Sequence, residues 1–291
     1  MNPNKFTQGS HSHANVSLVL EGAHMCVLKQ ADAADVRFAH SIDKQRNFTA
    51  IGLGGLSITA AQILHQDSRD GHMNIVMRYI TGMNGEDFAL QGDRAIAVEI
   101  SRALSALLLD SMAKSDIRDV SSGLFLDKMA QVVEATHWPT LASTMALASE
   151  CIHDVIGSRP TICVPLGPCH GDLTLSNVIW SPSLGLVLID FLATYLESPL
   201  QDLAKISQEM EFGWSFRHMD QNLRIKSQVF SQLAYPSYGR YLYALFPGAA
   251  YLFKLLCLAR IAPYVSDSVS ATWLIRSMQV VIAQAPATNT I

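Results

Sequence analysis

Three side chains in the middle of the chain carry oxygen atoms at a spacing that suits proton transfer and metal binding. The stretch from His170 to Asn177 reads His-Gly-Asp-Leu-Thr-Leu-Ser-Asn, which spaces Asp172 and Asn177 as H-x-D-x-x-x-x-N, and Asp190 ends an apolar run further on. A carboxylate at Asp172 can orient a hydroxyl group and accept its proton. Mg²⁺ prefers carboxylate and amide oxygens beside phosphates, and Asp190 and Asn177 would supply them. The pattern therefore suits a reaction in which a carboxylate accepts a proton beside a bound metal ion.

Each of these residues also has a structural interpretation. Taken alone, Asp172 and Asn177 are typical turn residues that bond to the backbone. Asp190 is harder to explain in this way, because an unpaired carboxylate at the end of a buried strand is costly. We interpret His170 as a hydrogen-bonding brace of the loop and Asp202 as a helix cap with a structural role. Within the whole pattern we favour Asp172 as a base.

The loop and the segment after it resemble a known family. Protein kinases share the spacing of the loop, with its Asp as base and its Asn as metal ligand. Gly171 and the run Pro199-Leu200-Gln201-Asp202-Leu203-Ala204 are similar to the aminoglycoside phosphotransferase and choline kinase family, the small-molecule branch of the protein-kinase-like fold. The match is compact over 170–204 and weaker over 9–82. The resemblance implies Mg-ATP-dependent transfer of the γ-phosphate to a hydroxyl group, with ATP and Mg²⁺ as cofactors, Asp172 as base, and Asn177 and Asp190 as metal ligands.

One expected partnership of this family is incomplete in the sequence. By resemblance, Lys29 at the end of a hairpin strand would pair with the α- and β-phosphates, although a lysine in that place is often a solvated edge charge. The family holds this lysine with a helix Glu, and the segment from Phe38 to Phe48 contains none. Asp43 and Gln45 are the nearest substitutes, and we expect Asp43 near the site in a structural role.

The rest of the nucleotide site is also assigned by resemblance. The polar stretch Gly9 to His13, with Ser10 and His11, would cover the phosphates, although it contains a single glycine. Its histidines are compatible with a metal site and equally with an exposed terminus. The carbonyl of Arg78 and the amide of Ile80 would contact adenine, and the alternative is an ordinary buried strand.

By resemblance, the acceptor is expected to be a small molecule, because the short segment between Asp190 and Asp202 leaves no room for the long activation segment with which a protein kinase grips a peptide. The candidate acceptor residues are Tyr195, Glu197, Glu209 and Trp214. Aromatic and acidic side chains can hold a cation or stack on a sugar, and they can equally belong to the core. The sequence favours a sugar, an amino alcohol or a similar metabolite, such as a surface-polysaccharide precursor, over an antibiotic.

Elements that would position these residues follow from the hydrophobic pattern. Strand periodicity dominates the first third and helical periodicity the remainder. The expected elements are a hairpin over 15–29, a helix within 35–50 interrupted by glycines at 52–55, a strand over 72–81, helices over 93–113 and 140–156, a polar connection over 160–168, and a core helix within 241–265. This order predicts an α+β, bilobal, protein-kinase-like fold. A small N-terminal antiparallel-sheet lobe for the nucleotide (1–82) would precede a larger helical C-terminal lobe for catalysis and substrate (83–291).

Composition limits the class of protein. The 291 residues are 49% hydrophobic and 16% charged, with a net charge of −4, so nothing indicates nucleic-acid binding. Five cysteines without a C-x-x-C predict reduced thiols and a cytoplasmic location. No apolar leader is visible in Met1 to His13, and Pro247, Lys254 and Arg260 interrupt the longest apolar stretch, so no membrane span is expected. A homodimer is one hypothesis for the low charged fraction.

Two other functions remain open at this stage. A catalytically silent, pseudokinase-type module could hold a nucleotide or partner without turnover, as the absent helix Glu and the glycine-poor loop would allow. A nucleotidyl transferase could use the same fold, and product mass would separate it from a kinase. A serine hydrolase is disfavoured because no G-x-S-x-G occurs, and a metal hydrolase because the ten histidines are dispersed.

Overall fold

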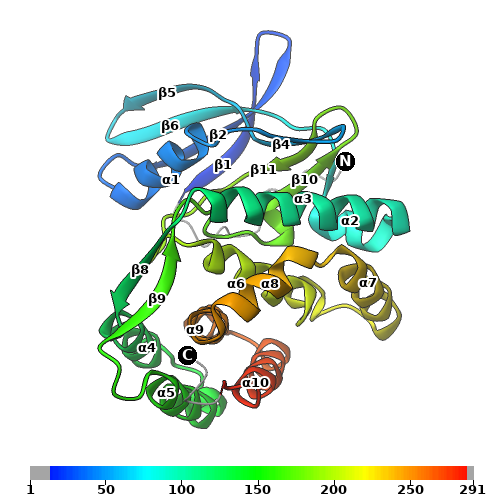
Figure 1. Cartoon of the computed structure of the whole chain (residues 1–291). Helices are drawn as coiled ribbons and strands as arrows, with labels where there is room; N and C mark the ends of the chain where they lie inside the picture. Colours follow the sequence, from blue (N-terminus) through cyan, green and yellow to red (C-terminus); the bar gives the residue numbers. More distant parts are fainter. Residues whose placement is uncertain (1–13, 287–291) are drawn as a thin grey trace.

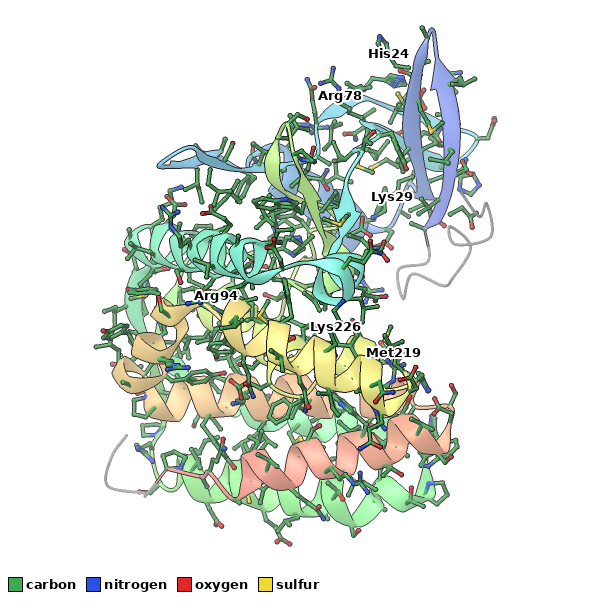
Figure 2. All side chains as sticks on the ribbon, turned by 90° about the vertical axis from the view of Figure 1, so that its right-hand side faces the viewer. His24, Lys29, Arg78, Arg94, Met219 and Lys226 are labelled. Atoms are coloured by element: carbon green, nitrogen blue, oxygen red, sulfur yellow. The ribbon has the colours of Figure 1, made fainter. Side chains whose placement is uncertain are left out.

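An antiparallel sheet and one helix form the first lobe (Figure 1). In this computed structural model, which describes residues 14–286, the strands β1 (Asn15–Glu21) and β2 (His24–Asp32) form the predicted hairpin. The strands β5 (Ile63–Arg69) and β6 (His72–Arg78) complete a sheet in the order β1-β2-β6-β5. The helix α1 (Val36–Arg46) begins where Asp35 accepts from two backbone amides, and its Phe38 and Ile42 pack on the sheet. In the side view of Figure 2, His24 lies at the far tip of the hairpin and Lys29 lies nearer the helical lobe.

A second sheet contains the two strands that follow the H-x-D loop, β10 and β11. Its members are β3 (Ile51–Leu53), β4 (Leu56–Ala60), β7 (Met83–Asn84), β10 (Val178–Ser181) and β11 (Gly185–Leu188), in the order β3-β4-β11-β10-β7. The glycines at 52–55, expected only to interrupt the chain, form a hairpin instead. Gly54 (φ 50°) and Gly55 (φ 91°) adopt left-handed conformations that allow the tight turn between β3 and β4. Because β4 pairs in parallel with β11, this hairpin connects the first lobe to the strand that leads to Asp190.

Helices build the second lobe around one large core (Figure 1). They are α2 (Gly85–Gln91), α3 (Arg94–Ala113), α4 (Gly123–Glu134), α5 (Ala142–Ile156), α6 (Pro199–Met210), α7 (Gln221–Ala234), α8 (Ser237–Leu245), α9 (Pro247–Ala259) and α10 (Ser268–Ile282). Short 3₁₀ turns cover Pro139–Leu141, Leu175–Asn177, Trp214–Phe216 and Ala262–Tyr264. The fold is therefore α+β and bilobal, as predicted. The lobe boundary at residue 82 stays a prediction.

Two expected elements differ from the structure. The polar connection expected over 160–168 contains β9 (Thr161–Leu166), which pairs with β8 (Asp116–Ser121). Pro160, Gly167 and Pro168 lie outside the strand, and Pro165 lies within it. Both strands of a two-stranded sheet are edge strands, in which a missing backbone amide is tolerated. The core helix expected within 241–265 is two helices, α8 and α9, which meet at Phe246 and Pro247.

Within residues 14–286, no single helix is both long and apolar enough to cross a membrane. The pair Ser237–Leu245 and Pro247–Tyr264 meets the length and hydropathy requirements only when taken together, and it is bent by 115°.

Candidate active site

The H-x-D loop is held in place by a buried carboxylate beneath it. Asp202, in the first turn of α6, accepts from the amides of His170 and Gly171, each at 2.7 Å. Burial raises the pKa of Asp202 to about 6, although both amide hydrogen bonds favour the charged form. Asp202 is therefore structural, as expected, but it is not the cap of α6. That position belongs to Ser198, whose hydroxyl accepts from the amide of Leu200.

His170 joins the two ends of the motif. Its Nδ1 accepts from the amide of Asp172 at 3.2 Å, and its Nε2 lies 2.8 Å from the carbonyl of Ile189, the residue before Asp190. Because a carbonyl only accepts, Nε2 carries the proton. Burial lowers the pKa of His170 to about 4, so the ring is neutral at pH 7, and it packs on Phe191 with centroids 4.3 Å apart. This contact brings Asp172 and Asp190 to the same place and confirms the brace expected of His170.

Gly171 is required by the close packing of this loop. Its φ is +90°, and a Cβ at this position would lie 2.0 Å from the carbonyl oxygen of Leu192. The amide of Leu192 in turn donates to the carbonyl of His170 at 2.9 Å. Only glycine allows the segment after Asp190 to lie against the loop so tightly.

Asn177 and Asp172 are joined in a way that leaves one amide oxygen available. The Nδ2 of Asn177 donates to the Asp172 carbonyl at 2.8 Å and to its Oδ2 at 3.0 Å. The Oδ1 of Asn177 receives no hydrogen bond from the described residues. Asn177 is thus oriented to present an oxygen, the donor type that Mg²⁺ prefers.

Lys205 of α6 completes the surroundings of Asp172 and is not among the residues predicted from the sequence. Its Nζ lies 3.0 Å from Asp172 Oδ1, and its side chain is 14% exposed. Burial pushes the pKa of Asp172 upward, but the Lys205 ammonium outweighs it and leaves that pKa below its ordinary value. Helical spacing was the available signal, because Lys205 follows Asp202 by three positions and shares its face.

Asp190 and Lys29 meet directly. Lys29 Nζ lies 2.6 Å from Asp190 Oδ1, and the side chains are 10% and 35% exposed. Asp190 has a φ of +59°, a strained conformation for a non-glycine residue that is typical of functional sites. One oxygen of Asp190 therefore faces the lysine of the sheet lobe.

These oxygens fit a magnesium ion that also binds phosphates. Within residues 14–286, no group of three or more His, Cys, Asp or Glu side chains could hold a metal alone. Mg²⁺ does not need one, since it is commonly bound by one or two protein oxygens together with substrate phosphates. Asn177 Oδ1 and the Asp190 carboxylate are such a donor set.

The other predicted nucleotide residues are partly placed. Arg78 ends β6, and its side chain is exposed while its amide donates to the Gln62 carbonyl at 2.9 Å. Ile80 is buried in a small apolar cluster with Ala61 and Val187. No hydrogen bond to the Ile80 amide is made by the part of the chain that the structure describes. Ser10 and His11 lie outside the described residues.

The expectation for Asp43 is wrong. Its carboxylate is exposed and pairs with Arg46 at 3.2 Å, because it lies on the outer face of α1. The residue of α1 that reaches the site is Lys44, which lies 2.5 Å from Glu197 Oε2 and donates to the Leu192 carbonyl at 2.7 Å. Lys44 was not predicted, because the family's residue at this place is an acid and Lys44 carries the opposite charge. Gln45 is buried and bonds to the Ala61 carbonyl instead of Lys29.

The predicted acceptor residues do not form an open site. Glu197 is occupied by Lys44 and by the amide of Thr194. The Oη of Tyr195 is buried without a hydrogen-bond partner among the described residues. Glu209 is 1% exposed and accepts from Ser215, and Trp214 packs on Trp273 with centroids 4.9 Å apart. For Glu209 and Trp214, the core alternative therefore holds in this structure.

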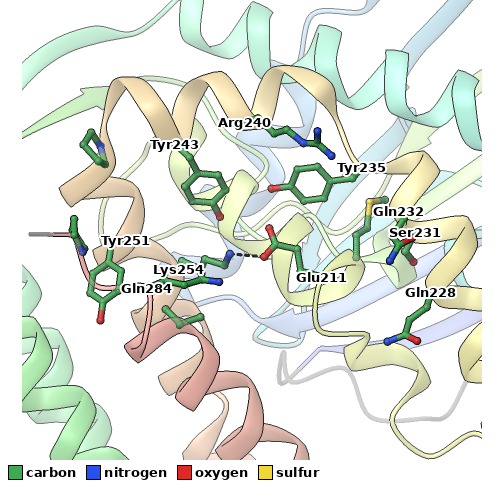
Figure 3. Close-up of a pocket in the computed structure, with 14 residues that line it drawn as sticks. Glu211, Gln228, Ser231, Gln232, Tyr235, Arg240, Tyr243, Tyr251, Lys254 and Gln284 are labelled. Atoms are coloured by element: carbon green, nitrogen blue, oxygen red, sulfur yellow. Dashed lines mark hydrogen bonds and ion pairs between the residues drawn. The ribbon is translucent and has the colours of Figure 1, made fainter.

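A cavity of about 780 Å³ lies apart from this site (Figure 3). Its wall includes Glu211, Tyr235, Tyr243 and Lys254, and Glu211 pairs with Lys254. At 100° per residue, Glu211 lies about 180° around α6 from Asp202. The cavity and the H-x-D loop therefore occupy opposite sides of α6.

Comparisons with known proteins agree with this geometry. The model of a family described as the phosphotransferase enzyme family matches residues 7–224, which is most of the chain. The choline kinase LicA from Streptococcus pneumoniae superposes with a TM-score of 0.54 at 12% identity, over 92% of this chain and 89% of that chain. A spectinomycin phosphotransferase in complex with ADP and spectinomycin gives 0.51 at 12% identity, over 98% and 93%. A glucosamine kinase gives 0.53 at 11% identity, over 90% and 74%. At these identities the likeness shows a shared fold, and no curated protein sequence matches the chain significantly.

Proposed function

The chain belongs to the phosphotransferase enzyme family, and we propose that it is a kinase that moves the γ-phosphate of Mg-ATP to a hydroxyl group of a small molecule. The observation that carries this proposal is the bridge made by His170. Its two ring nitrogens tie the Asp172 amide to the carbonyl of Ile189 and so bring together the base and a metal ligand. Asn177, bonded to Asp172, adds the second metal ligand.

Asp172 is proposed as the base. It is a carboxylate at neutral pH because Lys205 lowers its pKa against the effect of burial. A hydroxyl group placed against this carboxylate donates its hydrogen bond, is oriented toward the phosphate, and gives up its proton to Asp172. Lys205 and Asn177 each hold one carboxylate oxygen, so the side chain keeps one orientation.

The nucleotide is proposed to lie between the lobes. Bound Mg²⁺ would supply the positive charge that screens the phosphates from the carboxylates. Asn177 and Asp190 would hold the ion, and Lys29, 2.6 Å from Asp190, is within reach of phosphate oxygens at that ion. The backbone amide of Ile80, which has no partner among the described residues, would donate to the adenine of the nucleotide. Ala61 and Val187 would give the adenine an apolar surface.

The acceptor is proposed to be a small hydroxyl-bearing metabolite, such as a sugar or an amino alcohol. The neighbours in fold are kinases of choline, glucosamine and spectinomycin. The segment after Asp190 supports this class, because it is packed against α1 through Lys44 and Ser41 and offers no extended surface for a peptide.

Thermal unfolding with and without Mg-ATP tests the nucleotide site. At a ligand concentration of about 100 Kd, binding adds ~2.7 kcal/mol, which corresponds to a rise of about 4–5 °C in Tm for a chain of 291 residues. We expect this rise to require Mg²⁺ and to disappear in Asp190→Asn. Asp43→Asn is the matched control, because Asp43 is an exposed carboxylate outside the site. No rise in the unmodified protein, or the same rise in Asp190→Asn, would contradict the proposal.

A further inference from the structure

The side of Asp172 that faces away from Asp190 is lined by cations. Lys205 is in contact with the Asp172 carboxylate. Arg260 is the C-cap of α9, and its positive charge adds a smaller contribution to the lowered pKa of Asp172. Two contacts between α6 and α9, Cys257 with Gln208 and Lys254 with Glu211, show that the two helices are antiparallel. The end of α9 that bears Arg260 therefore lies beside the first turns of α6.

Arg260 has no acidic partner. Its guanidinium forms no ion pair with a carboxylate within residues 14–286, and its Nη1 is buried without a hydrogen-bond partner. Its guanidinium lies 5.9 Å from the ring of Tyr195. The helix dipole favours a cation at the C-terminus of α9 but does not satisfy the buried N–H groups of its side chain.

A second cation from another helix faces the same place. Phe125 of α4 packs on the ring of Tyr195 with centroids 6.4 Å apart, and Arg260 lies on the same ring, so Lys128, one turn after Phe125, is on the side of α4 that faces Arg260. The pKa of Lys128 is lowered by burial and by Arg260, in agreement with this placement. Its Nζ donates only to Gln131 Oε1, at 3.4 Å, among the described residues. Two like charges held together without a carboxylate are costly unless an anion joins them.

Two further unpaired groups near Arg260 can donate hydrogen bonds. Tyr195 Oη and Gln201 Nε2 are buried without a partner in the described chain, as are Arg260 Nη1, Tyr251 Oη and the acceptor Glu209 Oε1. Tyr195 contacts Arg260, and Gln201 lies one turn before Lys205 on α6. Donors and cations together recognise a group that only accepts hydrogen bonds.

Three acids around Asp172 and its loop are already occupied. Glu197 pairs with Lys44, Asp202 accepts two backbone amides, and Asp172 pairs with Lys205. Glu209 accepts from Ser215 through Oε2, and its buried Oε1 has no partner among the described residues. Burial favours the neutral form of Glu209 and raises its pKa to about 7, so this acid is a poor site for the ammonium group of a cationic alcohol.

We propose that the phosphate acceptor of this protein is an anionic alcohol, whose carboxylate or phosphate group binds Arg260 and Lys128 while its hydroxyl group faces Asp172. This inference rests on the proposed kinase function and adds the charge class of the acceptor. Arg260 is then a specificity-determining residue that binds the acceptor and takes no part in nucleotide binding. No covalent step is added, since the hydroxyl proton still goes to Asp172.

The test separates acceptors by charge. A protein-free, nucleotide-free small-molecule cell extract is divided by ion exchange into anionic, neutral and cationic fractions, and each is incubated with the protein and Mg-ATP labelled at the γ-phosphate. We expect labelled product from the anionic fraction alone. Arg260→Leu should lower this labelling at least about tenfold, as expected for one lost charge-assisted contact, through a higher KM for the acceptor.

Three controls make the outcome specific. Arg276→Leu, a change at an exposed arginine of α10, should label like the unmodified protein. Arg260→Lys should restore part of the labelling, because it restores the charge. Arg260→Leu should keep the Mg-ATP-dependent rise in Tm, which shows that the variant is folded and binds nucleotide.

Two results would overturn the anionic acceptor and leave the proposed kinase function unaffected. The first is labelled product from the neutral or cationic fraction alone, and the second is labelling of the anionic fraction by Arg260→Leu that equals the labelling by the unmodified protein. No labelling from any fraction, although Mg-ATP still raises Tm, would overturn the proposed function and this inference with it.

Discussion

Buried, hydrogen-bonding residues next to Asp172 hold this side chain and its loop in place. His170 is neutral and ties Asp172 to the segment of Asp190, and Lys205 keeps Asp172 ionised. The sequence predicted the proximity of Asp172, Asn177 and Asp190, because they occupy one local motif. Lys205 was not predictable from that motif, since it comes from a helix whose orientation depends on the packing of the whole lobe.

Glu209 is the residue whose buried charge has the clearest cost. Burial raises its pKa to about 7, from 4.5 for an exposed glutamate, although Ser215 donates to it. The folded state thus binds this proton more tightly than the unfolded state does. The contribution of Glu209 to stability is therefore full below pH 4.5 and is lost as the pH rises to 7.

Glu209→Gln should remove this loss, because glutamine has the shape of the protonated acid and cannot ionise. The free energy of unfolding of the variant should match that of the unmodified protein near pH 4.5 and exceed it by about 3 kcal/mol at pH 8. Urea unfolding of both proteins from pH 4.5 to pH 8 measures the difference. A difference that does not change with pH would contradict the assignment of a raised pKa to Glu209.

At the scale of elements, α1 is fastened to the segment after Asp190 by a lysine. Lys44 pairs with Glu197 and donates to the Leu192 carbonyl, and the Ser41 hydroxyl accepts from the Ala193 amide at 3.3 Å. The phosphate-binding candidate Lys29 pairs with Asp190 without any help from α1. The absence of a helix Glu is therefore compensated by a different connection between the lobes, which a sequence search for an acid could not reveal.

A double-mutant cycle on Lys44→Met and Glu197→Gln measures this connection. The side chains are 13% and 33% exposed, so we expect a coupling free energy of about 1–2 kcal/mol. The matched control is the pair Arg46 and Asp43 on the same helix, which is 46% and 61% exposed and should couple by less than about 0.5 kcal/mol. Equal coupling in the two cycles would show that Lys44 does not fasten the lobes.

At the scale of the whole molecule, local patterns predicted elements better than their assembly. The hairpin of β1 and β2, the strand β6 and the helix α3 follow from periodicity and turn residues, and the structure confirms them. The β3–β4 hairpin and the pairing of β8 with β9 were not predicted, because they depend on partners far away in the sequence. The burial of Glu209 and the pairing of Glu197 were not predicted for the same reason, since both are decided by packing.

The central claim is that the γ-phosphate moves to a hydroxyl group with Asp172 as base. The direct measurement compares ATP labelled at the γ-phosphate with ATP labelled at the α-phosphate, in the unmodified protein and in Asp172→Asn. We expect only the γ-label to enter the product, and the rate to fall by about 10²–10⁴-fold in Asp172→Asn while Mg-ATP still raises its Tm. Entry of the α-label would identify a nucleotidyl transferase, and nucleotide binding without transfer of either label would identify a silent binding module; either result would contradict the account.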